Sequence, residues 1–452
     1  MKIKIMIMAA LCVLVGGIVA AATFKTGDAL HGLYEYKDFQ KATYCRQCHV
    51  EIYYQWKKSL MAQAFTHEWD EIEYFDMAVE HAKRNPKFKD AVDGCNGCHA
   101  PFSYMAGDTP PPRPEKRSMA NEGVSCDVCH TINHFDESKL YNYSYHSSPG
   151  RKKYGARGGK NSPAHGLEKF DKMKTAEFCA NCHNEKSPWD VWVKSTYNEW
   201  KEGPYSKEGV PCQDCHMPPA PGQRAKTDKT KYDDVRQHTF HGGHFPAKYN
   251  GAIDVLIYPE MEFVEPGMRI RISVYLYNQK CGHKVPTGSV EDRILYLHVE
   301  AEDSKGDVYH LKVDKKGFEG EEYTIASEAK AYQDLAEMMD VPEGFDGLRR
   351  EDVPLGNRIF RMPYFTEKGQ MTMAQWNTAR LGVDYRIGPR ETKVETFTWT
   401  VPGKMPPGPV KVRAKLNYRL LVKPVAEFMK VPESEYKDRL INSDEAEFEV
   451  IY

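Results

Sequence analysis

The sequence lacks several features, and each absence argues against a class of protein. After residue 22 no apolar run is long enough to cross a bilayer, and no low-complexity tract occurs. Basic and acidic residues nearly balance, with 62 Lys and Arg against 64 Asp and Glu, so nothing indicates nucleic-acid binding. Unassigned cysteine is scarce too, because only Cys12 and Cys281 stand outside one recurring pattern. The ten other cysteines therefore carry most of the information.

The first 22 residues differ from the rest of the chain. Lys2 and Lys4 precede the apolar run "IMIMAALCVLVGGIVAAA", which ends in small residues near Ala22. This order predicts a secretory signal peptide over residues 1–22, with an uncleaved membrane anchor as the alternative. We therefore expect an exported protein, in the periplasm or at the cell surface.

The recurring pattern is C-x-x-C-H, which occurs five times. Its cysteines are Cys45, Cys48, Cys95, Cys98, Cys126, Cys129, Cys179, Cys182, Cys212 and Cys215, and its histidines are His49, His99, His130, His183 and His216. Two cysteines at this spacing form thioethers with one porphyrin, and the imidazole that follows can bind the iron from below. Zinc ribbons and dithiol redox sites do not need a histidine after every second cysteine. The motifs predict five covalently attached c-type haems.

The composition changes sharply near residue 250. All five motifs and fourteen of the seventeen histidines come before it. Alternating apolar and polar segments follow it, at residues 268–279, 293–303, 392–402 and 410–422. Such alternation, cut by Gly and Pro, is typical of antiparallel strands. We predict an α + β two-domain protein: a mostly helical, loop-rich pentahaem domain over residues 23–249, then an antiparallel β-sandwich over residues 250–452 that carries no haem and serves in docking or shielding.

Several stretches resemble a known group of proteins. "YCRQCHVEIYYQWKKSLMAQAF" (44–65), "GCNGCHAP", "EGVSCDVCHTI", "FCANCHN" and "GVPCQDCHMP" are similar to stretches of multihaem c-type cytochromes related to the tetrahaem electron carrier of hydroxylamine oxidation. The resemblance covers roughly residues 40–245. "CGHKVPTGS" (281–289) is similar to a C-terminal β-domain attached to some of these proteins. The resemblance implies electron transfer.

One position departs from that family. Where its members usually have a histidine after W-x-x-S-x, this chain has Met61. Methionine is either an axial ligand here, which would raise the haem potential, or a core residue against a porphyrin face. If residues 52–64 form one helix, as their four-residue apolar spacing indicates, Met61 lies about 18 Å along it from His49. If Met61 is a ligand, it would therefore bind the iron of a neighbouring haem.

Five irons need up to five further ligands. The strongest candidates are His238, His241, His146, His165 and His134, with Met61 and His283 in addition. His283 would tie the sandwich to the haem domain. The charged surroundings of His67 and His81 favour side chains in solvent, and His298 and His310 are interpreted as packing residues of the β domain.

Three functions remain open at this point. Five haems on about 200 residues must lie close together, which favours an electron carrier of anaerobic respiration rather than a catalyst. Its partners would be a quinol-side donor and a terminal reductase or extracellular acceptor. The alternatives are an oxidoreductase that acts on nitrite or hydroxylamine at an open haem, and a subunit of an extracellular cytochrome filament built from many copies. No C-x-x-C-K motif, typical of pentahaem nitrite reductases, occurs.

Overall fold

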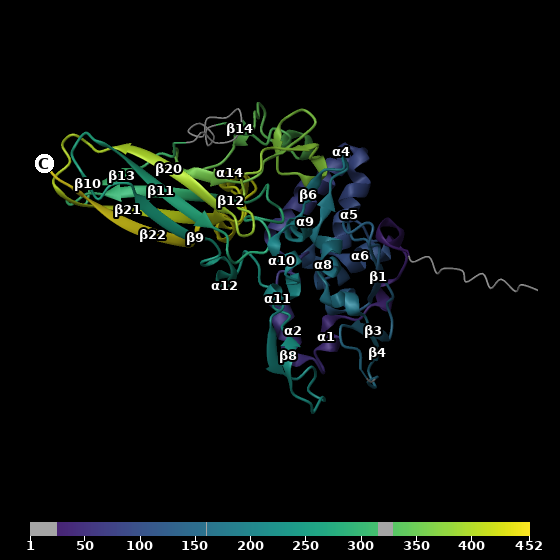
Figure 1. Ribbon diagram of the computed structural model, residues 1–452. Helices are drawn as coiled ribbons and strands as arrows, with labels where there is room; N and C mark the ends of the chain where they lie inside the picture. The colour runs from purple at the N-terminus through teal and green to yellow at the C-terminus, as the bar shows by residue number, and fades with distance from the viewer. Residues whose placement is uncertain (1–24, 160, 315–328) are drawn as a thin grey trace, which may run out of the picture.

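The computed structural model describes residues 25–159, 161–314 and 329–452, so the predicted signal peptide lies outside the described residues. Two regions follow each other along the chain, a helical one that carries the motifs and a β-rich one (Figure 1). Within the described residues, no helix combines the length and the apolar character needed to cross a bilayer.

The first region consists of short helices and two-stranded sheets. Its helices are α1 (Ala42–Cys45), α2 (Val50–Lys57), α3 (Glu68–Ile72), α4 (Val79–Arg84), α5 (Lys89–His99), α6 (Pro101–Ala106), α7 (Cys126–Cys129), α8 (Ala176–His183), α9 (Thr196–Glu202), α10 (Pro204–Lys207), α11 (Cys212–His216) and α12 (Pro246–Tyr249). Its strand pairs are β1 (Ile132–Phe135) with β2 (Tyr145–Ser147), β3 (Lys152–Gly155) with β4 (Gly166–Lys169), β5 (Glu185–Lys186) with β6 (Trp192–Lys194), and β7 (Pro219–Gly222) with β8 (Tyr232–Arg236). A π-helical stretch, Glu73–Ala78, joins α3 to α4.

The helix expected over residues 52–64 is shorter than predicted. α2 ends at Lys57, and turns follow it as far as Thr66. Ser59 causes the break: its hydroxyl donates to the carbonyl of Trp56 at 2.7 Å and accepts from the amide of Ala62 at 3.3 Å. Such local side-chain bonds compete with the helical ladder. The distance of about 18 Å inferred along a continuous helix therefore does not apply.

The second region contains two larger sheets. Its strands are β9 (Asp254–Pro259), β10 (Phe263–Val264), β11 (Arg269–Tyr277), β12 (Ile294–Glu302), β13 (Val308–His310), β14 (Lys330–Ala331), β15 (Leu348–Arg349), β16 (Arg358–Phe360), β17 (Tyr364–Phe365), β18 (Met371–Thr372), β19 (Arg380–Leu381), β20 (Thr392–Thr400), β21 (Gly408–Arg419) and β22 (Arg439–Val450), with helices α13 (Leu335–Met338), α14 (Lys423–Phe428) and α15 (Glu433–Tyr436). One sheet has the order β10-β22-β21-β12-β13, with β16 on β12, and the other β20-β11-β9.

The four alternating segments of the sequence form β11, β12, β20 and β21. Their period of two puts one face inward: Ile270, Ile272, Val274 and Leu276 of β11 are all fully buried. The two sheets meet where β9 contacts β22, and there Asn442 of β22 donates to the carbonyl of Ile253, just before β9. The region is not wholly antiparallel, since β10 pairs with β22 in parallel.

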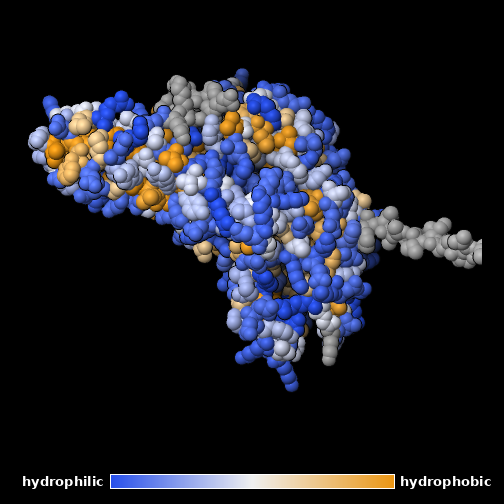
Figure 2. Space-filling model, in the orientation of Figure 1, coloured by the Kyte–Doolittle hydropathy of each residue, from blue (hydrophilic) through white to orange (hydrophobic). Residues whose placement is uncertain are grey.

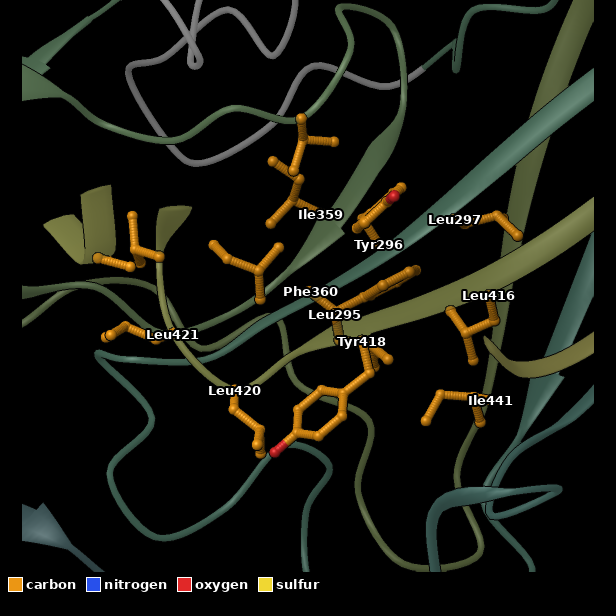
Figure 3. Packing of buried hydrophobic residues seen from close by; sticks show 14 of the residues in the cluster. Leu295, Tyr296, Leu297, Ile359, Phe360, Leu416, Tyr418, Leu420, Leu421 and Ile441 are labelled. Carbon is orange, nitrogen blue, oxygen red and sulfur yellow. The ribbon is translucent and has the colours of Figure 1, made fainter. Parts of the chain in front are cut away.

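The face of the molecule shown in Figure 2 is mostly hydrophilic, but apolar residues gather at the end of the β region that lies farthest from the helices. The main core of the molecule lies within the β region, where Leu295, Phe360 and Leu416 interdigitate (Figure 3). This core continues into the helical region through Trp69 and Met77. The two regions therefore share apolar packing as well as the chain.

Candidate haem-binding site

The motif residues surround a single connected cavity that lies mainly in the first region and is also bordered by residues of the second. All ten motif cysteines and all five motif histidines line it, and its volume is about 3820 Å³. A pocket for one drug-sized ligand occupies about 300–1,000 Å³, so this cavity has room for several large groups. Residues spread over more than 170 positions of the chain thus converge on one space, as covalently attached porphyrins require.

The motif histidines are oriented by backbone carbonyls. Four of them place Nδ1 within 2.9 Å of a carbonyl oxygen: His49 faces Arg224, His99 faces Ala64, His130 faces Tyr154 and His216 faces His241. A carbonyl can only accept, so the proton of each imidazole sits on Nδ1. Nε2 then keeps its lone pair for a metal, and the bond to the carbonyl fixes the ring orientation.

Three motif histidines face a second histidine across the cavity. The ring centroids lie 6.2 Å apart for His49 and His165, 6.4 Å for His130 and His238, and 6.4 Å for His216 and His283. Iron bonded to two imidazoles on opposite sides, with bonds of about 2 Å and about 1.1 Å from nitrogen to ring centre, separates the centroids by roughly 6.2–6.4 Å. Each pair could therefore hold one haem iron between its rings.

The second members of these pairs are oriented in the same way. Nδ1 of His165, His238 and His283 lies 3.1, 3.0 and 2.8 Å from the carbonyl of Gly166, Arg236 and Lys284, respectively. Burial also lowers the pKa of His216 and of His238 to about 4. Both imidazoles are neutral at pH 7, which is the form that binds iron.

The other predicted ligands are placed differently. His134 and His146 are opposite each other in the β1–β2 pair, and neither borders the cavity. The ring of His241 stacks on Phe245 with centroids 4.3 Å apart. Its backbone carbonyl contributes to the site by accepting a hydrogen bond from His216. Met61 does border the cavity.

His99 and His183 have different surroundings from the other three motif histidines. In the described part of the chain, no ring contact joins either of them to another histidine. Burial lowers the pKa of His183, and the nearby ammonium of Lys194 lowers it further. Both residues line the same cavity.

Cysteines of different motifs lie close together inside the cavity. The thiol of Cys126 lies close enough to Cys45 to shift its pKa, and Cys182 likewise shifts the pKa of Cys98 and Cys212 that of Cys179. These thiol sulfurs occupy the positions of the thioether sulfurs that form when haem is attached. They bring together the first motif with the third, the second with the fourth, and the fourth with the fifth. Cys129 lies close enough to Cys179 to raise its pKa, which connects the third motif to the fourth. The attachment points form one connected group, in which the fourth motif adjoins the second, the third and the fifth.

The β region contributes to this site through the loop that carries His283. Glu199 of α9, almost completely buried, holds the loop: its carboxylate accepts from the hydroxyl of Thr287 at 2.6 Å and from the amide of Lys284 at 3.2 Å. It also pairs with the guanidinium of Arg386 at 2.6 Å. No local pattern predicts this role, because a glutamate in a short helix normally lies in solvent.

Two histidines predicted to lie in solvent are not there. His81 is 1% exposed, and its Nδ1 accepts from the indole of Trp376 at 3.0 Å. Burial lowers its pKa to about 4. His67 is half-buried between Asp70 and Glu435. In both cases at least one partner is hundreds of residues away, so the local charge pattern was misleading.

The shared cavity and the oriented histidines define a multihaem c-type cytochrome. Comparison of the sequence supports this class: residues 44–131 match the family described as cytochrome c554 and c-prime, and residues 164–256 match the N-terminal region of the NapC/NirT cytochrome c family. The chain is thus a multihaem c-type cytochrome, as the motifs predicted, and this class implies electron transfer. No curated protein is significantly similar to the chain.

The fold resembles that of a solved multihaem protein. A penta-heme cytochrome c552 from Thermochromatium tepidum aligns over 91% of this chain and 99% of its own, with a TM-score of 0.65 and 22% identity. The sporulation control protein Spo0M from Bacillus subtilis aligns over 44% of this chain and 49% of its own, at 15% identity and a TM-score of 0.17. The latter similarity is too weak to support an inference.

Proposed function

We propose that this protein is an exported electron carrier that holds five c-type haems in one connected group. The observation that supports this most strongly is the set of three histidine pairs at 6.2–6.4 Å within one cavity. An iron with two imidazole ligands has a closed coordination shell, which suits a carrier because its geometry changes little with oxidation state. The proximity of cysteines from different motifs would keep neighbouring porphyrins near one another. In this role the chain would pass electrons between a quinol-side donor and a terminal or extracellular acceptor.

The proposed ligand sets follow from these pairs. His165 would bind the iron of the first motif, His238 that of the third and His283 that of the fifth. Of the other candidates of the sequence, Met61 is the one that borders the cavity, and it would be the sixth ligand of the second or the fourth motif.

Two measurements test this function. Intact-mass spectrometry of the denatured mature protein should give the polypeptide plus five haems, and four or fewer would refute the count. In the ferric protein, His165→Ala and His238→Ala should each convert one haem from low spin to high spin in electron paramagnetic resonance. His310→Ala, a histidine outside the cavity, is the control and should change none. If neither ligand variant changes a spin state, the proposed pairs are wrong.

One observation favours catalysis as a second candidate. Glu73, Glu291 and Asp292 form a cluster in which the last two residues are buried and Glu73 is partly buried, and loss of solvent raises the pKa of all three, that of Asp292 to about 6. Glu73 and Lys194 lie near Cys95 of the second motif and shift its pKa. Buried proton donors beside an open haem would suit the reduction of nitrite or hydroxylamine, which consumes protons. A high-spin signal in the wild-type monomer that shifts when either compound is added would favour this candidate over the carrier.

A further inference from the structure

A second group of metal-type ligands lies beside the haem cavity. His67 precedes α3, His244 precedes α12, and Glu435 belongs to α15 of the β region. The Oε2 atom of Glu435 lies 3.4 Å from Nε2 of His67 and 3.3 Å from Nε2 of His244. Three ligand atoms from distant parts of the chain therefore converge on one point.

The spacing of these atoms matches a tetrahedral centre. Bonds of about 2.1 Å at about 109° place neighbouring ligand atoms about 3.4 Å apart and two imidazole centroids roughly 5.2 Å apart. The centroids of His67 and His244 are 5.2 Å apart, with an interplanar angle of 85°. This differs from the 6.2–6.4 Å of the pairs that would flank a haem iron. The two rings are therefore too close to bind one iron from opposite sides, but they suit adjacent positions on a smaller centre.

A carboxylate orients one of the ligands from behind. Oδ2 of Asp70 lies 2.8 Å from Nδ1 of His67, so His67 can donate there and direct the lone pair of Nε2 toward Glu435. This carboxylate–histidine arrangement is the usual support of a metal-binding imidazole. The other oxygen of Asp70 lies 3.6 Å from Nδ1 of His99, the motif histidine of the second haem.

We propose that His67, His244 and Glu435 bind a zinc-type divalent ion, distinct from the haem irons. Two imidazoles and one carboxylate are a common three-ligand set for zinc and leave the fourth position open. All three side chains border the haem cavity, so that position faces the cavity. The ion would fasten α15 of the β region to the haem region. Through Asp70 it would also be coupled to the ligand of one haem.

Metal analysis of the holoprotein tests the proposal. The protein is treated with a chelator, dialysed against Zn²⁺ and then against metal-free buffer, and zinc is counted against haem iron by mass spectrometry. We expect one zinc per chain in the wild type and none in Glu435→Gln, which keeps the size of the side chain. Asp70→Asn should weaken zinc binding roughly 10–100-fold, because it removes the orienting carboxylate rather than a ligand.

His310→Ala is the matched control. His310 and His298 also form a close pair, with Glu300 beside His298, but their rings are parallel at 11° and their nitrogens point to other partners. The control should keep the zinc, and every variant should keep the haem absorption of the wild type. The proposal fails if the wild type holds no zinc, since the group is then only a hydrogen-bonded ion pair network. It also fails if Glu435→Gln keeps the zinc, or if His244→Ala turns a low-spin haem high-spin.

Discussion

The haem region and the β region fill their interiors in different ways. The β region has one large apolar core, in which residues such as Leu295 and Leu416 are fully buried. Most of the haem region has only small apolar clusters, the largest of ten buried residues, arranged around a cavity of about 3820 Å³. Among its described residues the α-helices are short: the longest, α5, has eleven residues, and a longer helical segment arises where the π-helical stretch joins α3 to α4. Helices of this length are marginal without packing, so the haems themselves must supply the missing core.

Removal of the haems should therefore have the largest effect. When the chain is made in cells that lack haem attachment, we expect the haem region to be unfolded and the β region to remain folded. Limited proteolysis should cut first between α6 and β8 and leave a resistant fragment that contains β9 to β22. Equal resistance of the two regions would contradict the contrast between them.

The connection between the regions should be the next most sensitive point. Glu199→Gln removes one of the two carboxylates that pair with the buried guanidinium of Arg386, the other being Asp384, and should cost at most the about 3–5 kcal/mol that is typical of breaking a buried ion pair. Because Glu199 also holds the loop of His283, thermal unfolding should occur at lower temperature and one ferric haem should become high-spin. If the unfolding temperature falls but no spin state changes, Glu199 stabilises the fold through its ion pair without positioning His283 as a haem ligand.

A cavity within the apolar core should affect only the β region. Leu416→Ala removes a fully buried side chain and should lower the free energy of unfolding by about 2–5 kcal/mol. Chemical denaturation followed by tryptophan fluorescence measures this change. The haem absorption of the folded protein should stay as in the wild type, and a change there would mean that the two interiors are coupled more closely than their packing indicates.

The smallest effect is expected at an exposed ion pair between the same two regions. Arg390 pairs with Glu208, and both side chains are more than 40% exposed. Arg390→Gln should cost at most about 1 kcal/mol, since water already screens the charges. It is the matched control for Glu199→Gln in the same unfolding assay. A loss comparable to that of the buried pair would show that burial does not decide the strength of the connection.

The sequence was informative where the signal is local. Five motifs and four alternating segments predicted the haem region and the main strands, because a C-x-x-C-H spacing and a period of two are read from neighbouring residues. It was least informative for contacts across long stretches of chain. The partners of His81 and Glu199 are Trp376 and Arg386, and no local pattern pairs them. The break after α2 came from a single hydroxyl, that of Ser59, within an apolar spacing that favoured a longer helix.

The spin state of the His283→Ala variant tests the central claim most directly, namely that the β region completes the haem site. His283 lies opposite His216 with ring centroids 6.4 Å apart. In the ferric protein, electron paramagnetic resonance should show one haem converted from low to high spin, with the haem count by intact mass unchanged. If every haem keeps the spectrum of the wild type, the β region supplies no ligand and the two regions are joined by packing alone.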